Sequence, residues 1–203
     1  MIQLMEELHH ARNYNELTLH VAVGIADRYL AHLAKTGEPA PLLSHLSVIS
    51  LLMAAKLNEP LVPAFINMVN MINGWQKGHM TSKDLVNLEE KILKALGFDL
   101  VWTTPLHFLE RFQRLFALDM ILHDKHSYLI DSSAIYLCRF MLRDHNFLTF
   151  KPSHIAVAAF MLALNANLET PLSKALDVEL LDPQFINVES YFQDTTIRIR
   201  ING

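Results

Sequence analysis

Two charged side chains of opposite sign stand at the edges of helical patterns that otherwise suit a protein core. Lys56 ends the apolar run 48–55, and Glu89 opens the run 88–96. Burying an unpaired ammonium group costs several kcal/mol, so charges are uncommon at such positions. The sequence therefore predicts that Lys56 and Glu89 lie in neighbouring helices as a partly buried ion pair with a role beyond packing.

Histidines are the other residues whose types could support chemistry. His123-Asp124 is the pair used by metal-dependent His-Asp phosphohydrolases, and His45 and Asp131 could complete a ligand set. The pair falls between two predicted helices, however, where a polar loop is the ordinary explanation. The sequence contains no His-Glu-x-x-His motif, Gly-rich phosphate loop or paired-cysteine zinc spacing. We therefore expect no metal site and no cofactor, and keep a phosphohydrolase only as an alternative.

The composition is that of a folded chain with a substantial core. Of its 203 residues, 51% are hydrophobic and 19% charged, and the formal charge is −4. This mild acidity gives no reason to expect nucleic acid or an anionic membrane as a partner. The lone Cys138 cannot form an internal disulfide, which fits a reducing compartment, and we expect a buried structural thiol. No leader peptide or membrane-length apolar run is visible, so we expect a soluble intracellular protein.

Apolar residues recur at spacings of three and four along most of the chain, which predicts an all-α fold. Asn15 and Thr18 can cap the second helix, Thr81 precedes a helix that ends near Gly97, and Pro152 suits a first turn. The helices are predicted at residues 2–11, 17–35, 42–57, 62–72, 81–96, 104–117, 126–144, 152–167, 171–178 and 183–194.

The two halves of the chain resemble each other. The segment 47–55 overlays 153–161, and each is an almost entirely apolar helix rich in small residues. Such a helix suits the centre of a small bundle, surrounded on all sides. With a similar order of helices on either side, this predicts two five-helix bundles in tandem.

In this arrangement the chain resembles a cyclin. The segment 18–30 ends in Asp-Arg-Tyr-Leu, similar to the Asp-Arg-aromatic-Leu ending of the family's second helix. The segment 104–112 resembles the start of the second box in mitotic A- and B-type cyclins. The remaining similar segments are 52–59, 81–100 and 151–164, so that most of residues 15–168 carries the resemblance.

The resemblance implies tandem cyclin boxes at residues 1–100 and 101–203, and a cyclin-dependent protein kinase as partner in a heterodimer. Lys56 and Glu89 match the family residues that bond main-chain groups of the kinase. A charge-assisted hydrogen bond is stronger than a neutral one, and mutual pairing offsets desolvation. An ion pair that merely ties two helices together is the alternative. Candidates for the apolar part of the kinase-binding surface, each with core packing as the alternative, are Leu57, Pro60, Val62, Phe65 and Ile92.

The function that the resemblance implies is regulatory. A cyclin turns the kinase's regulatory helix inward, so that its Glu pairs with the ATP-binding Lys and the activation segment moves aside. We therefore expect a non-enzymatic activating subunit in the cell cycle or a related process, located in the nucleus, the cytoplasm or both. A cyclin-fold scaffold that binds a non-kinase partner is the alternative.

The sequence departs from the family pattern in two places. The Arg that pairs with the residue at position 27 has no counterpart, which leaves Asp27 as a structural carboxylate for Arg12 or Arg28 to neutralise. Gln3 and Leu4 occupy the usual Asp-Trp positions of the groove that docks Arg-x-Leu peptides, so the sequence does not favour this docking. The turn at 58–63 also differs from the family's, in a region that faces the kinase.

Overall fold

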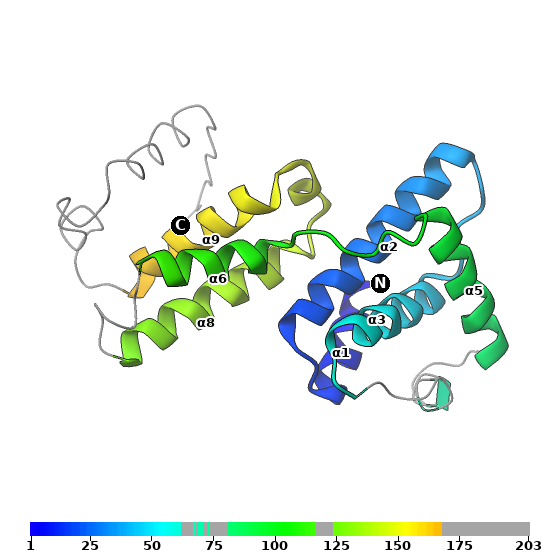
Figure 1. Cartoon of the computed structure of the whole chain (residues 1–203), viewed down its shortest axis with the longest axis horizontal. Helices are drawn as coiled ribbons and strands as arrows, with labels where there is room; N and C mark the ends of the chain where they lie inside the picture. The colour runs from blue at the N-terminus through cyan, green and yellow to red at the C-terminus, as the bar shows by residue number, and fades with distance from the viewer. Residues whose placement is uncertain (62–66, 68, 71–72, 74–80, 117–123, 168–203) are drawn as a thin grey trace.

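The structure is a computed structural model that describes residues 1–61, 67, 69–70, 73, 81–116 and 124–167. In these ranges all regular elements are helical, and they form two groups joined by an extended connection (Figure 1). The predicted all-α class is therefore confirmed. The longer elements are α1 (Ile2–Arg12), α2 (Glu16–Thr36), α3 (Leu43–Asn58), α5 (Ser82–Ala95), α6 (Pro105–Phe116), α8 (Asp124–Met141) and α9 (Pro152–Asn167), with a 3-10 turn η1 (His145–Thr149).

Helix α3 is the centre of the first group. Every residue from Leu46 to Ala55 is buried, because α1, α2 and α5 pack around the helix. Small residues such as Ser47, Ser50 and Ala54 let the neighbouring backbones approach closely. The prediction of a surrounded apolar helix is confirmed for this segment, and its enclosed position leaves only the ends of α3 available at the surface.

The second group is built on α9, which packs against α8 and α6. Its own core includes Phe160 and Leu164 of α9, Leu109 of α6, and Ile130 and Cys138 of α8. This core is a separate cluster from the one around α3. The predicted buried thiol at Cys138 is confirmed, since the residue is 1% exposed.

Several helix ends form where the sequence indicated. The Asn15 side chain caps α2 by accepting a hydrogen bond from the Leu17 amide at 2.9 Å. Thr81 and Asp84 form a reciprocal capping box at the start of α5. Gly37 ends α2 with a φ of 73°, a left-handed conformation that glycine adopts without steric cost. Pro152 is the first residue of α9, as predicted.

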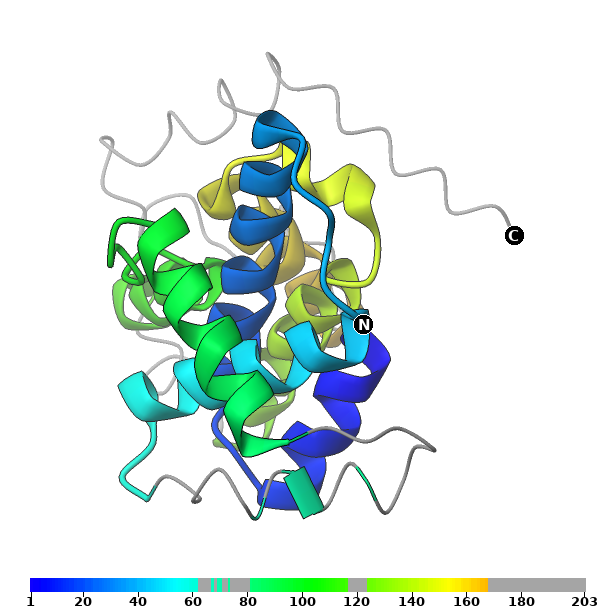
Figure 2. The same ribbon diagram turned by 90° about the vertical axis from the view of Figure 1, so that its right-hand side faces the viewer.

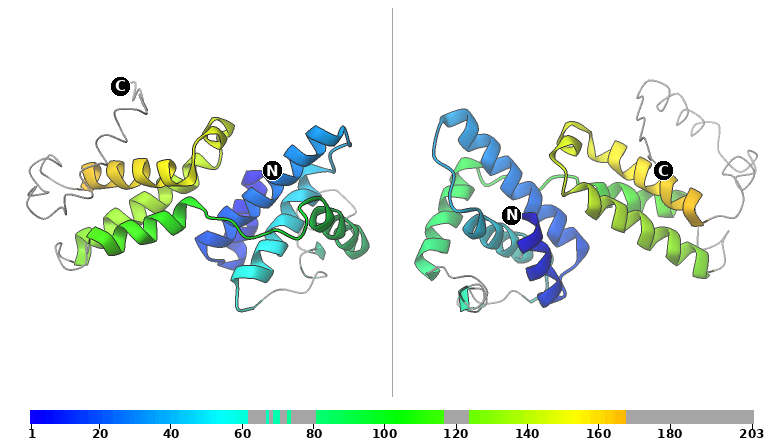
Figure 3. Two further views of the ribbon diagram at one scale, coloured as in Figure 1. Left: turned by 45° about the horizontal axis from the view of Figure 1, so that its top comes forward. Right: turned by 180° about the vertical axis from the view of Figure 1, so that it is seen from behind.

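The connection between the two groups is fastened to α2. The Arg28 guanidinium donates to the main-chain oxygen of Asp99 at 2.8 Å and lies 5.1 Å from the ring centre of Trp102. Trp102 packs against Gly24, where a Cβ atom would lie only 2.2 Å from the ring. These contacts fix the path by which the chain leaves α5, crosses α2 and enters α6 (Figures 2 and 3).

Some predicted segments lie outside the described residues. This applies to the helices at 171–178 and 183–194 and to most of the helix at 62–72. The described residues near 62–72 are 67, 69, 70 and 73, and all four are helical. None of the helices in the described part of the chain is long and apolar enough to span a membrane.

Candidate functional site

The predicted ion pair is present. Lys56, in the last turn of α3, places its Nζ atom 2.5 Å from Oε1 of Glu89 in the middle of α5. The Lys56 side chain is 38% exposed and that of Glu89 is 17% exposed. The pair therefore lies at the edge of the first helix group, where a partner could cover it.

The position of Glu89 follows from the amphipathic pattern of α5. Leu85, Leu88 and Ile92 are all buried and form one stripe at helical spacing against α3. Glu89 stands beside this stripe, at the margin between core and solvent. Ile92 itself is 0% exposed, so our assignment of it to a binding surface is wrong: its side chain belongs to the core.

Apolar residues beside Lys56 are at the surface. Leu57 is 48% exposed and Pro60 is also exposed, so both are available for contact. Their neighbour Leu61 is 84% exposed. The remaining candidates, Val62 and Phe65, lie outside the described residues.

Further exposed apolar residues near the pair were not predicted. Val86 lies one turn before Glu89 on the same face of α5 and is 48% exposed. Leu93 follows Glu89 by four residues and is half-buried. The spacing 86–89–93 could have identified this stripe, because residues three and four apart share a helix face. Phe98, also missed, is exposed and has a φ of 60°, which is unusual for a bulky residue.

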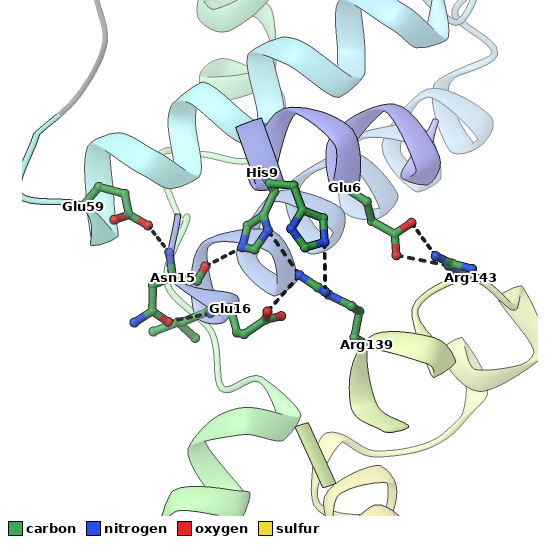
Figure 4. A network of polar contacts seen from close by, with 9 residues as sticks. Glu6, His9, Asn15, Glu16, Glu59, Arg139 and Arg143 are labelled. Carbon is green, nitrogen blue, oxygen red and sulfur yellow. Dashed lines mark hydrogen bonds and ion pairs between the residues drawn. The ribbon is translucent and has the colours of Figure 1, made fainter. Parts of the chain in front are cut away.

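The end of α3 is anchored directly after Lys56. Glu59 accepts a hydrogen bond from the Asn15 amide at 2.8 Å (Figure 4). It accepts another from the Thr18 hydroxyl. Thr18 therefore binds α3 rather than capping its own helix. The contact joins residues more than 40 positions apart in the sequence, so no local pattern could have indicated it.

A polar network connects the first helix group to α8 of the second (Figure 4). Nη2 of Arg139 lies 2.8 Å from Oε1 of Glu16 and 3.2 Å from Nδ1 of His9. Just beyond the end of α8, Arg143 binds both carboxylate oxygens of Glu6, at 3.1 and 2.8 Å. A bidentate pair of this kind restricts direction as well as distance. The network therefore restrains how the two groups sit against each other.

Burial shifts the pKa of several groups near the boundary between the two helix groups. Desolvation lowers the pKa of His20 to about 3, and the charge of Arg139 acts in the same direction. Desolvation also raises the pKa of Asp27 to about 6 and that of Cys138 to about 12. Among the described residues no cation offsets the Asp27 shift, and Arg28 pairs with Asp99 instead. The expectation that Arg12 or Arg28 neutralises Asp27 is therefore wrong, since neither contributes to its pKa. Cys138 is held as an unreactive thiol.

The residues considered for a metal site do not come together in what the structure describes. His45 lies on α3 and Asp131 on α8, in different helix groups. Within the described ranges, no group of three His, Cys, Asp or Glu side chains is arranged to hold a metal ion. His123 lies outside the described residues.

Tandem all-α bundles, with a Lys–Glu pair at the edge of the first, define the class of protein. The model of the cyclin N-terminal domain matches residues 1–101, and that of the cyclin C-terminal domain matches residues 103–190. Together these matches cover most of the chain, which therefore belongs to the cyclin family.

Relatives and solved structures agree with this assignment. The chain is 30% identical to the G2/mitotic-specific cyclin-B of Dictyostelium discoideum, over 72% of this chain and 30% of that protein. It is 32% identical to the G2/mitotic-specific cyclin cig2 of Schizosaccharomyces pombe, over 72% of this chain and 32% of the relative. The chain thus spans about a third of the length of these relatives.

The fold is similar to that of a viral cyclin from herpesvirus saimiri, with a TM-score of 0.70 and 16% identity. That match covers 95% of this chain and 81% of the viral one. A chain in the CAK complex from Chaetomium thermophilum bound to ATP-gamma-S gives a TM-score of 0.62 at 17% identity. The second match covers 94% of this chain and 54% of the other. At this level of identity the likeness concerns the fold alone.

Proposed function

We propose that this chain binds and activates a cyclin-dependent Ser/Thr protein kinase and has no catalytic activity of its own. The observation that carries the proposal is the Lys56–Glu89 pair, 2.5 Å apart at an edge where apolar side chains are exposed. We call this surface the Lys56–Glu89 face. Its described members are Lys56, Leu57, Pro60, Val86 and Glu89.

The Lys56–Glu89 face combines the two features that a stable contact needs. Leu57 and Val86 supply apolar area, which contributes roughly 25 cal/mol for each Å² removed from water. The paired charges supply direction, because charge-assisted hydrogen bonds to main-chain groups require a defined geometry. Holding the two charges together before binding reduces the cost of desolvating them when a partner covers the face.

The action that follows is positional. A kinase whose regulatory helix packs against the Lys56–Glu89 face is held with that helix turned inward. The helix's Glu can then pair with the ATP-binding Lys, and the activation segment can move aside. The rigid core around α3 and the Glu59 anchor keep the face in one geometry, which suits a protein that stabilises a single conformation of its partner.

Three further statements belong to the proposal. The first cyclin box comprises residues 1–100 and the second 101–203, supported by the two separate cores and by family matches that end at 101 and begin at 103. Val62 and Phe65 extend the kinase-binding surface. The protein acts inside the cell, in the nucleus, the cytoplasm or both.

The test is to mix the purified chain with a panel of purified cyclin-dependent kinases and to measure complex formation and histone phosphorylation. We expect at least one kinase to bind the chain and to become active only in its presence. A chain that binds none of the panel, or binds without raising activity, would contradict the proposal. If the chain binds no kinase of the panel but forms a stable complex with a non-kinase protein in a separate binding experiment, the scaffold alternative is favoured.

A further inference from the structure

The end of helix α3 that carries Lys56 lacks the closure found at two other helix ends. Helices α1 and α2 are each followed by a residue in the left-handed conformation, Asn13 with a φ of 51° and Gly37 with a φ of 73°. Such a residue turns the chain so that its amide bonds a carbonyl of the last turn. Helix α3 is followed by Glu59, whose φ of −102° and ψ of 140° are extended, and then by Pro60, which has no amide hydrogen. The last turn of α3 therefore needs another support.

The Glu59 side chain supplies this support by binding the start of α2. Its Oε1 atom accepts a hydrogen bond from the Asn15 amide at 2.8 Å (Figure 4). The same atom accepts a second one from the Thr18 hydroxyl. Amide hydrogens at the amino end of a helix have no partner within the helix and attract negative charge. The carboxylate thus occupies a position that suits an anion and holds the end of α3 against α2.

The contact completes a capping box from a different helix. In a capping box the N-cap side chain accepts from a first-turn amide, and a Glu or Gln three residues later binds the N-cap amide. Asn15 is the N-cap of α2 and accepts from the Leu17 amide at 2.9 Å. The residue three positions later is Thr18, which has no carboxylate, and Glu59 of α3 binds the Asn15 amide in its place. The cap of α2 and the end of α3 therefore depend on one side chain.

The position of Lys56 depends on how this turn is held. Lys56 and Glu59 lie three positions apart, and Lys56 reaches α5 through Glu89 while Glu59 reaches α2. The two contacts thus hold the end of α3 from two sides. The ends of helices fray because their last carbonyls lack partners within the helix. If only a fraction of the chains keeps Lys56 beside Glu89, a partner that needs both charges binds with an apparent affinity reduced by that fraction.

We propose that Glu59 is a positioning residue for kinase binding, which holds Lys56 in place by completing the cap of α2. This consequence rests on the proposed function, because the position of Lys56 matters to a kinase only if the Lys56–Glu89 face binds one. Glu59 acts through Lys56 and not by touching the kinase. Thr18 is 0% exposed and bonds Glu59 from inside the first helix group, so it can probe the positioning without touching a bound kinase.

The first test measures the affinity of three variants for a kinase that the chain activates. Glu59→Ala removes both hydrogen bonds and is expected to weaken binding about ten-fold or more. Glu59→Gln keeps an Oε1 acceptor for both donors and should stay within about three-fold of the wild type. Thr18→Val removes only the hydroxyl and should weaken binding about three-fold or more. Equal affinity of the wild type, Glu59→Ala and Thr18→Val would overturn the proposal.

Ser47→Ala is the matched control for Thr18→Val. Ser47 is also 0% exposed, and its hydroxyl donates to the main-chain oxygen of Leu43 at 2.7 Å, toward the opposite end of α3. The substitution removes a buried hydroxyl without touching the Glu59 contact, so it should leave the kinase affinity unchanged. Circular dichroism checks that every variant folds. If Ser47→Ala weakens binding as much as Thr18→Val does, the effect is a general loss of stability and the proposal fails.

A Lys56→Ala background separates positioning from direct contact. If Glu59 acts through Lys56, adding Glu59→Ala to Lys56→Ala should weaken kinase binding further by less than about two-fold. The same further loss as in the wild-type background would show that Glu59 acts independently of Lys56, and it would contradict the proposal.

Hydrogen exchange tests the positioning without a kinase. Exchange of the Leu57 and Asn58 amides, followed by NMR, reports how often the last turn of α3 opens. Glu59→Ala should speed their exchange about ten-fold and leave that of Phe160 in α9 unchanged. Unchanged exchange at the end of α3 would overturn the proposal. If exchange responds as expected but the wild type binds no kinase, the proposed function fails while Glu59 still positions the turn that carries Lys56.

Discussion

Arg139 of the second helix group forms an ion pair with Glu16 of the first, with 2.8 Å between Nη2 and Oε1. The same carboxylate stands in the first turn of α2 and lines a groove between α2 and α6. Its position thus links the start of α2, the boundary between the boxes and the groove. The Arg139 side chain is largely buried, so this pair is less screened by solvent than a surface pair.

Arg139→Met is expected to lower the free energy of unfolding by about 1–3 kcal/mol, because it leaves the Glu16 carboxylate partly buried without its cation. Adding Glu16→Gln removes that charge, so the double variant should be less destabilised than the sum of the single ones. Urea unfolding of the wild type, both single variants and the double variant gives the coupling free energy, which we expect to exceed about 1 kcal/mol. Strict additivity of the two substitutions would contradict this account of the pair.

Gly24→Ala tests the packing of Trp102 against α2. The added Cβ would lie 2.2 Å from one ring carbon of Trp102, so the indole must leave its position. We expect a loss of about 1–3 kcal/mol in the free energy of unfolding, as for other overpacked sites. Trp102 fluorescence, recorded in a Trp75→Phe background, should shift to the red as the ring gains exposure. Unchanged emission together with unchanged stability would show that the connection does not depend on this contact.

His20→Leu tests the acid sensitivity of the box boundary. The folded chain keeps His20 neutral down to about pH 3, whereas the unfolded chain protonates it near pH 6.5. In that window the unfolded state binds more protons, so stability falls as the pH falls, by about 1.4 kcal/mol per unit at most. The variant should therefore lose less stability than the wild type between pH 6.5 and 4.5. If the free energies of unfolding of the two proteins change with pH in parallel, the pKa of His20 is not lowered in the folded chain.

Asp27→Asn should have the opposite dependence on pH. Burial raises the folded pKa of Asp27 to about 6, above the unfolded value of 3.8, so the folded state holds a proton that the unfolded state has released. This contribution to stability is complete below pH 3.8 and is lost as the pH rises through 6. The variant should thus have a free energy of unfolding roughly 1–2 kcal/mol higher than that of the wild type at pH 7.5. At pH 4 this difference should be smaller. A loss of stability at pH 7.5 would mean that a cation pairs with Asp27.

The arrangement of the helices around Lys56 and Glu89 could be predicted because local signals determine it. Apolar spacing located α3 and α5, and the Thr81 cap fixed where α5 begins. The same spacing places Ile92 on the buried stripe of Leu85 and Leu88, so its assignment to a surface neglected a periodicity that the sequence contains. Charges at the margin of such stripes pair across helices, and the Lys56–Glu89 contact could therefore be inferred.

The contacts between the two helix groups could not be predicted. Glu16 and Arg139 are exposed-type residues in unremarkable helical positions, and nothing near either one in the sequence indicates its partner. Asp27 was expected to pair with a nearby cation, but Arg28 points to Asp99 and Trp102 instead. Such choices depend on how whole helices pack, since charged side chains with several rotatable bonds can reach different partners.

The most direct test of the proposed function is the affinity of the chain for a kinase that it activates, compared between two pairs of substitutions. Lys56→Ala/Glu89→Ala removes the ion pair of the Lys56–Glu89 face. Lys94→Ala/Glu90→Ala removes a pair of similar length, 2.6 Å, that is fully at the surface of the same helix. Removing charges at a protein interface typically costs about 2 kcal/mol or more, which is roughly 30-fold in Kd.

We predict that the first pair of substitutions weakens kinase binding about 30-fold or more and that the second leaves it within about three-fold of the wild type. Both variants should unfold within a few degrees of the wild type, since neither pair is deeply buried. Equal kinase affinity of the wild type and Lys56→Ala/Glu89→Ala would contradict the account, and the pair would then only join α3 to α5.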